Sequence, residues 1–152
     1  ESWVTLQIPS EDESALRSII NAYDSAKKER TRNINKLHAT FNQNGIPFLK
    51  KSDLQNNSDR IENIAKHLKG LAENDACMVE ARITLIEKQI EEYVDLMRQA
   101  LMKHPEISLV WLSLPGIRTI VAASLLAYLG DGSRFYSASQ LRNYIGLVPM
   151  VQ

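Results

Sequence analysis

The sequence predicts an all-α fold: a long antiparallel coiled-coil helical hairpin, followed by a small helical domain with a helix-hairpin-helix-like turn. Apolar side chains recur three and four residues apart over two long segments, which is the spacing of one helix face. Glycine and proline are scarce, with six and five among 152 residues, and aromatic residues make up only 7%. This composition favours long helices over a turn-rich β-sandwich.

The whole-chain composition excludes several classes of protein. With 44% apolar and 24% charged residues, the chain is too hydrophobic to be disordered. The 18 basic and 18 acidic side chains cancel, so the net charge indicates no partner. A single cysteine, Cys77, excludes an internal disulfide. Because there is no apolar run of about 18 residues and no signal peptide, we expect a cytoplasmic protein without a membrane partner.

Residues 1–10 alternate apolar and polar side chains at Val4, Leu6 and Ile8, as in a strand with one buried face. No other segment is suited to pair with this strand, and a lone strand is marginal in water. The chain also begins with Glu rather than Met. We therefore expect the chain to be an internal piece of a longer protein.

A coiled-coil domain is expected over residues 11–104. Ser10 and Glu13 form a capping box, and Asn44-Gly45 is a helix stop, which predicts a helix from about Glu11 to Gln43. Residues 46–57 are expected to be a loop. The apolar positions of the first helix follow a heptad spacing with a polar middle. They are Leu16, Ile20, Tyr23, Ile34, Leu37 and Phe41.

A second helix is expected to start at a cap, Asn57 or Ser58, and to run to about Glu73, with a break at Asn74-Asp75. Its apolar stripe comprises Ile61, Ile64, Leu68 and Leu71.

A third helix should then run to His104-Pro105, and its 4,3 spacing is the strongest periodic pattern of the sequence. We expect this seam to pair with the first helix and with a second chain, giving a homo-oligomer. The seam residues are Val79, Ile83, Ile86, Ile90, Tyr93 and Met97.

The region 105–152 has shorter, densely apolar helices and is expected to be a separate, truncated domain. Pro115-Gly116-Ile117 is a tight turn between two such helices, as in a helix-hairpin-helix. Backbone N–H groups around Gly116, Arg118 and Thr119 could hold a phosphate. Equally, the turn could be an αα corner that only packs the domain. Arg118 stands where nucleic-acid-binding hairpins usually have a second glycine.

A local basic segment lies in the first helix, where five basic residues between positions 23 and 38 face only two acidic ones. These side chains could contact nucleic acid, although a solvated helix face would have the same composition. Three of them, spaced four apart, share one stripe. The basic residues are Lys27, Lys28, Arg30, Arg32 and Lys36, of which Lys28, Arg32 and Lys36 form the stripe.

No catalytic or metal site is predicted in this chain, and no cofactor is expected in it. Most acidic residues lie beside lysines, as on solvated helix faces. The three histidines, at His38, His67 and His104, show no zinc-ligand spacing with one another or with Cys77. No glycine-rich phosphate loop is present.

Two groups of motifs resemble one protein family. The first comprises Pro115-Gly116-Ile117, Gly130-Asp131, Arg134-Phe135, Ser137 to Leu141, and Gly146 to Pro149. The second is the run Arg30-Thr31-Arg32, Asn35, Leu37 and His38. With these motifs the chain resembles the IS-one-ten (DEDD-type) insertion-sequence transposases, the family that includes the pilin-gene inverting recombinase.

The resemblance implies a bacterial DNA transposase or recombinase that exchanges DNA strands with a divalent metal, Mg²⁺, and a structured guide RNA. In this family four acidic residues lie in a RuvC-like domain and a nucleophilic serine lies in the C-terminal domain. The resemblance implies that residues 1–10 are the exit strand of the RuvC-like domain, so the acidic residues are expected before residue 1 and the serine after Gln152. No catalytic residue therefore maps onto this chain, whose partners would be DNA, guide RNA and further copies. The alternative is a non-enzymatic, dimerising helical scaffold.

Overall fold

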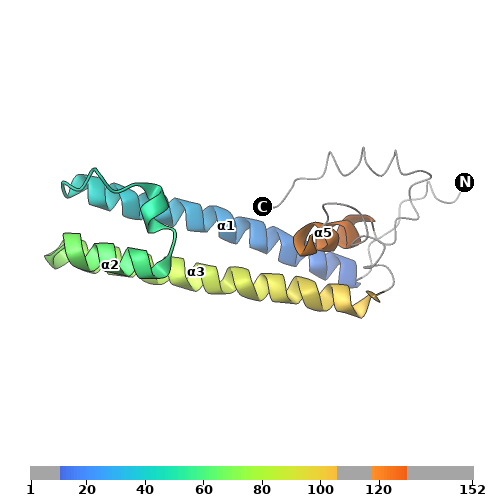
Figure 1. Cartoon of the computed structure of the whole chain (residues 1–152). Helices are drawn as coiled ribbons and strands as arrows, with labels where there is room; N and C mark the ends of the chain where they lie inside the picture. The colour runs from blue at the N-terminus through green and yellow to red at the C-terminus, as the bar shows by residue number, and fades with distance from the viewer. Residues whose placement is uncertain (1–10, 106–117, 130–152) are drawn as a thin grey trace, which may run out of the picture. The chain divides into compact units, whose positions relative to one another are not determined.

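The structure is a computed structural model, and it describes residues 11–105 and 118–129. Within these residues the fold is all-α, as predicted. Its elements are helix α1 (Glu11–Gln43), the 3-10 turn η2 (Lys51–Leu54), α2 (Asn57–His67), α3 (Gly70–Lys103) and α5 (Thr119–Leu129) (Figure 1). None of the described helices is long and apolar enough to cross a membrane. The expected strand at 1–10, the turn at 115–117 and the elements expected beyond Leu129 lie outside the described residues.

The chain divides into two compact units. Unit 1 combines Glu1–Asp24 with Glu92–Gln152, and unit 2 is Ser25–Glu91. The division therefore falls within the two long helices, a grouping that the sequence analysis did not expect. The domain boundary predicted near residue 104 stays a prediction.

Helix α1 has the bounds that its sequence predicts. Three acidic residues, Glu11 to Glu13, occupy its first turn, where they complement the positive end of the helix dipole. At the other end, the Ile46 N–H donates to the Phe41 carbonyl at 2.9 Å. Gly45 has a φ of 79°, in the left-handed region that glycine adopts without strain. The predicted stop at Asn44-Gly45 is confirmed.

The junction between α2 and α3 differs from the prediction. α2 begins at Asn57, with Asn56 rather than Asn57 or Ser58 as its N-cap, and ends at His67. The break lies at Leu68–Lys69, where Leu68 is extended and Gly70 has a φ of 65°. The predicted break at Asn74-Asp75 is wrong, because both residues lie inside α3. Glycine relieves the strain of the left-handed turn, whereas asparagine and aspartate disfavour a helix only weakly.

The shifted break also changes which residues of the predicted second-helix stripe are buried. Ile64 and Leu68 are buried, as expected, but Ile61 and Leu71 are exposed. Leu71 now belongs to α3, so it no longer shares a helix face with Ile64. The loop expected at 46–57 contains the short turn η2, whose Leu54 is fully buried.

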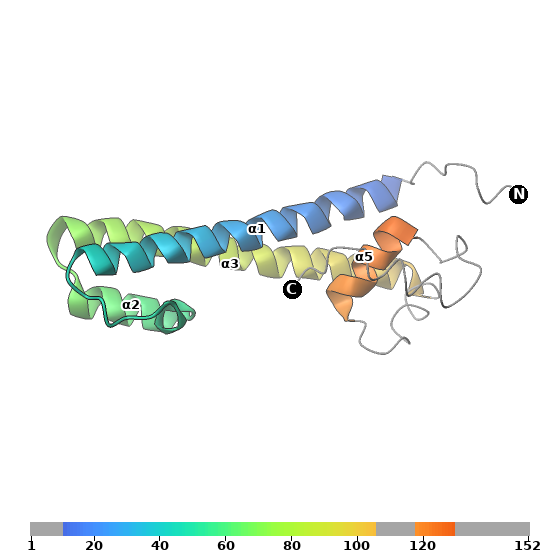
Figure 2. The ribbon, with the colours of Figure 1, turned by 90° about the horizontal axis from the view of Figure 1, so that it is seen from above.

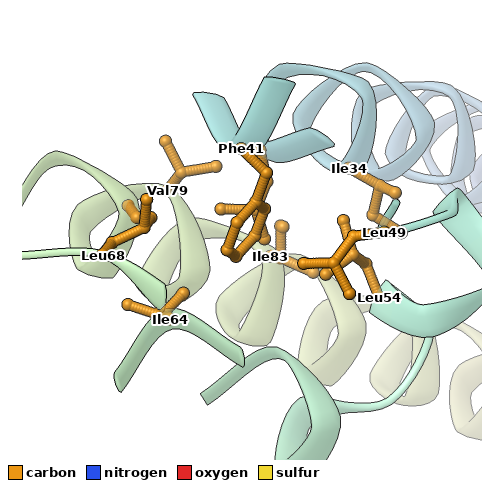
Figure 3. Packing of buried hydrophobic residues seen from close by; sticks show 10 residues of the cluster. Ile34, Phe41, Leu49, Leu54, Ile64, Leu68, Val79 and Ile83 are labelled. Carbon is orange, nitrogen blue, oxygen red and sulfur yellow. The ribbon is translucent and has the colours of Figure 1, made fainter. Parts of the chain in front are cut away.

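The core of unit 2 joins the end of α1, the loop, α2 and the beginning of α3 (Figure 3). α2 runs back alongside the first turns of α3 (Figure 2). Phe41 of α1 lies among side chains of α3 and α2. Because the core residues of α1 and α3 are spaced three and four apart, each helix presents one apolar stripe. The cluster comprises Ile34, Leu37, Phe41, Leu49, Leu54, Ile64, Leu68, Ala76, Val79 and Ile83.

Unit 1 has a core of its own, in which α5 is the most apolar element. Arg17 of α1 donates from Nε to the Ala127 carbonyl at 2.8 Å, and its guanidinium lies 4.6 Å from the ring centre of Tyr128. Burial, and secondarily the charge of Asp24, raises the pKa of Tyr23. The buried apolar residues of this unit are Leu16, Ile20, Tyr23, Met97, Leu101, Ala122, Ala123, Leu125, Leu126 and Ala127.

The predicted heptad seam of α3 is packed within the chain itself. Val79, Ile83, Ile86 and Met97 are buried, whereas Ile90 and Tyr93 are half-buried. In unit 2, Val79 and Ile83 share a cluster with residues of α1, as expected for a seam that pairs with the first helix. Pairing of these residues with a second chain, and the supercoiling of the helices, stay predictions.

Candidate nucleic-acid interface

Three of the five predicted basic residues lie exposed on α1 within unit 2. Lys28, Arg32 and Lys36 are one helical turn apart and therefore share one face. Asn35 is exposed on the same face. Glu29, next to Lys28 in the sequence, is exposed at the edge of this face. The face therefore presents three cations and the amide of Asn35 to solvent, with the carboxylate of Glu29 at its edge.

The other two basic residues of the stretch, Lys27 and Arg30, are half-buried, and the bonds of Arg30 lie inside the unit. Arg30 donates from Nε to Glu87 Oε2 at 2.9 Å. It also donates from Nη2 to the Gln55 carbonyl at 2.8 Å and from Nη1 to Gln55 Oε1 at 3.3 Å. The guanidinium of Arg30 is thus engaged by the chain itself, which reduces its availability for a phosphate. Lys27 is half-buried as well.

Arg60 of α2 is a buried charge that the sequence analysis missed. Its side chain is 0% exposed, and its Nε donates to Glu80, which is also buried. Nη2 donates to Glu87 Oε1 at 2.6 Å, and Nη1 donates to the carbonyls of Leu54 and Gln55 at 3.1 and 3.0 Å. Arg60 therefore joins two acidic residues of α3 to the backbone of η2.

The electrostatic balance around Arg60 favours its charged form. Burial lowers the pKa of Arg60. The hydrogen bonds and charges of Glu87 and Glu80 raise this pKa by more than burial lowers it, so that the net shift is upward. A sequence signal for this cluster exists. Arg60 precedes Ile64 and Leu68 at a spacing of four, which places it on the buried face of α2.

A groove of about 530 Å³ lies between α2 and α3 in unit 2. At its polar side, Asn57 Nδ2 donates to Glu80 Oε1 at 2.5 Å and to Thr84 Oγ1 at 2.9 Å. Thr84 also donates to Glu80 Oε1 at 2.7 Å. Glu80 thus links the buried cluster to the groove. The groove is lined by Asn57, Ile61, Ile64, Ala65, Glu73, Cys77, Glu80, Ala81 and Thr84.

The loop between α1 and η2 is anchored to α1 and to α2. The imidazole Nε2 of His38 lies 2.7 Å from the Leu49 carbonyl, and Leu49 is buried. The ring of Phe48 meets the ring of His67 edge-on, with 5.4 Å between the ring centres. These contacts fix the loop, and they use His38, one residue of the motif that carries the family resemblance.

The predicted phosphate site at the start of α5 is described only in part. Gly116 lies outside the described residues. Arg118 is exposed, and its carbonyl accepts the Ala122 N–H at 2.7 Å, so Arg118 opens the helix. Thr119 is the first residue of α5 and is half-buried. Phosphate binding at this turn stays a prediction.

No metal site is found in the described part of the chain. Within residues 11–105 and 118–129, no group of three or more His, Cys, Asp or Glu side chains is placed to hold a metal ion. The single cysteine, Cys77, is a free thiol and is exposed.

Comparison with known proteins bears on the C-terminal part of the chain. Residues 110–152 match the model of the transposase IS116/IS110/IS902 family. The match supports assignment to a transposase family. It covers α5 and the motifs from Pro115 to Pro149, whereas the basic segment of α1 lies outside it. No curated protein and no solved structure matches the chain.

Proposed function

We propose that this chain is the part of a DNA transposase or site-specific recombinase that contacts nucleic acid and associates with further copies of itself. The family match at residues 110–152 supports a transposase-related function. The nucleic-acid contact is carried by one observation: Lys28, Arg32 and Lys36 are exposed together on one face of α1. Three cations one turn apart can each approach a phosphate.

The partners that we propose are DNA and a structured guide RNA, met in the bacterial cytoplasm. The resemblance of the sequence to the IS-one-ten transposases suggests both. A face of lysine and arginine side chains binds phosphates of either nucleic acid, because phosphate contacts position a protein without reading sequence. With a neutral whole chain, we expect weak binding that depends strongly on salt.

The test is a salt titration of binding to structured RNA and to duplex DNA. The triple variant Lys28→Gln, Arg32→Gln and Lys36→Gln should flatten the slope of log K against log salt by about 3 on B-DNA, since each contact contributes about 0.9. Circular dichroism should show unchanged helicity, because glutamine is nearly as good a helix former as lysine.

A matched control removes three exposed lysines of unit 2 that lie outside α1. These are Lys66, Lys69 and Lys88, each replaced by Gln. The control should keep the slope of the parent chain. Equal flattening by both triple variants would show that net charge, and not the α1 face, governs binding. Salt-independent binding, or none, would favour the non-enzymatic scaffold instead.

For the chemistry, we propose from the resemblance that the catalytic acidic residues and the nucleophilic serine belong to segments other than residues 1–152. A divalent ion such as Mg²⁺ would serve the parent protein. The described residues offer no group of three carboxylate, imidazole or thiol ligands that fits such an ion. We therefore assign no metal-dependent step to them.

A further inference from the structure

An apolar stripe of α3 faces solvent in unit 2. Leu71, Met78 and Leu85 are 87%, 67% and 55% exposed. They are seven residues apart, or two helical turns, and therefore lie on one face about 21 Å long. The heptad residues Val79 and Ile83 are buried on another side of the same helix. The exposed stripe therefore lies on a different face of α3 from these buried seam residues.

Charges beside the stripe indicate which partner fits it. Asp75 and Arg82 are exposed, seven residues apart, and lie on the same side of the stripe. Consider a second copy of α3 that lies antiparallel, related by a twofold axis beside Met78. Each residue of one copy then lies opposite the residue of the other copy whose number brings the sum to about 156. Asp75 of one copy is opposite residue 81 of the other, one residue from Arg82.

In this arrangement the apolar side chains of the stripe meet apolar side chains, and the two charged residues meet opposite charges. Leu71 of each copy meets Leu85 of the other, and the two Met78 side chains meet at the axis. The twofold axis keeps Asp75 and Arg82 on one side of the contact and generates two ion pairs. A parallel twofold pair would instead place Asp75 and Arg82 of the two copies on opposite sides of the contact, so neither of these ion pairs could form.

We propose that the stripe formed by Leu71, Met78 and Leu85 is a self-association surface, on which a second copy of the chain binds antiparallel about Met78. The proposal deepens the self-association part of the proposed function. Its test involves no nucleic acid, so the two proposals can fail separately.

Disulfide cross-linking tests the register. In a Cys77→Ser background, which removes the native thiol, three single variants are made: Met78→Cys, Leu71→Cys and Leu85→Cys. On mild oxidation at tens of micromolar protein, only Met78→Cys should give a linked dimer. The other two place their thiols about 21 Å from their own copies, much farther than a disulfide spans. A mixture of the Leu71→Cys and Leu85→Cys chains should cross-link.

Two outcomes would overturn the proposal. Cross-linking of each single variant with itself would indicate a parallel pair. A monomer mass by light scattering at tens of micromolar, with no cross-link from Met78→Cys, would show that no second copy covers the stripe.

Charge reversal provides an independent measurement. Asp75→Arg should raise the dimer dissociation constant between about twofold and thirtyfold, because it removes two symmetry-related exposed pairs. Asp75→Arg combined with Arg82→Asp should restore the parent value. Glu91→Arg, which reverses an exposed acidic residue of α3 away from the stripe, is the control and should have no effect. Failure of the double reversal to restore dimerisation would contradict the antiparallel pairing.

Discussion

Unit 2 and unit 1 build their cores from different side chains. Unit 2 surrounds Phe41 with large aliphatic residues and also buries the guanidinium of Arg60 with Glu80. Unit 1 packs α5 through alanines and leucines. Arg17 of this unit is half-buried, and its guanidinium stacks on the ring of Tyr128.

Substitutions should therefore destabilise the two cores in different ways. A buried charge destabilises the fold when its partner is removed, because the remaining charge is left without water or a counter-ion. An alanine face lets helices approach closely, so it tolerates little added volume. We therefore expect unit 2 to be most sensitive to lost charge partners and the α5 face of unit 1 to be sensitive to enlargement.

The largest effect is expected for Arg60→Met in unit 2. The substitution leaves the buried Glu80 without its counter-ion, and should lower the free energy of unfolding by about 3 to 5 kcal/mol. Urea denaturation, with hydrogen exchange to locate the loss in Ser25–Glu91, measures the change.

The double variant Arg60→Met with Glu80→Leu is the matched comparison. It should recover most of the loss, since replacing both members of a buried ion pair is often nearly neutral. Glu87 keeps Arg30 as a partner in that variant. If the double variant is as unstable as the single one, the loss of packing, and not the unpaired charge, explains the effect.

A smaller effect is expected for Ala123→Leu in unit 1. Ala123 is fully buried on α5, so the added atoms must displace neighbours, at a cost of about 1 to 3 kcal/mol. The same change at Ala39, an exposed residue of α1, is the control and should alter stability by less than about 0.5 kcal/mol. Thermal and urea unfolding would reveal the difference, and equal effects at both positions would contradict a tight α5 face.

The smallest effect concerns Tyr23 and appears only in alkaline solution. Its raised pKa means that the folded state holds the phenol proton more tightly than the unfolded state. This contribution is complete below about pH 10 and is lost as the pH rises through the folded-state pKa. The free energy of unfolding should then fall by at most about 1.4 kcal/mol per pH unit.

The Tyr23→Phe variant isolates this contribution. Because phenylalanine has no ionisable proton, the variant should show a shallower decline of stability above pH 10 than the parent chain. Denaturation at several pH values compares the two slopes, and identical slopes would mean that Tyr23 does not ionise differently on folding.

Several features of the molecule follow from local sequence. The bounds of α1 were predicted from a capping pattern and from Asn44-Gly45, because helix ends depend on hydrogen bonds within a few residues. The burial of Val79, Ile83 and Ile86 followed from heptad spacing. The exposure of Lys28, Arg32 and Lys36 agrees with their common stripe. The α2–α3 break differs from the predicted one because the chain turns at Gly70, whose φ is 65°, and Asn74-Asp75 continue the helix.

Which polar groups are buried and which apolar groups are exposed depends on contacts between residues that are distant in the sequence. Arg30 and Lys28 are neighbours of like charge, yet Arg30 turns inward because Glu87, 57 residues away, accepts its hydrogen bond. Arg60 can be buried because the fold brings to it Glu80 and Glu87, which lie 20 and 27 residues later in the sequence. Leu71 is exposed because the chain reverses at Gly70. Such outcomes depend on partners distant in sequence, since a buried charge is tolerated only where the fold brings its counter-charges to it.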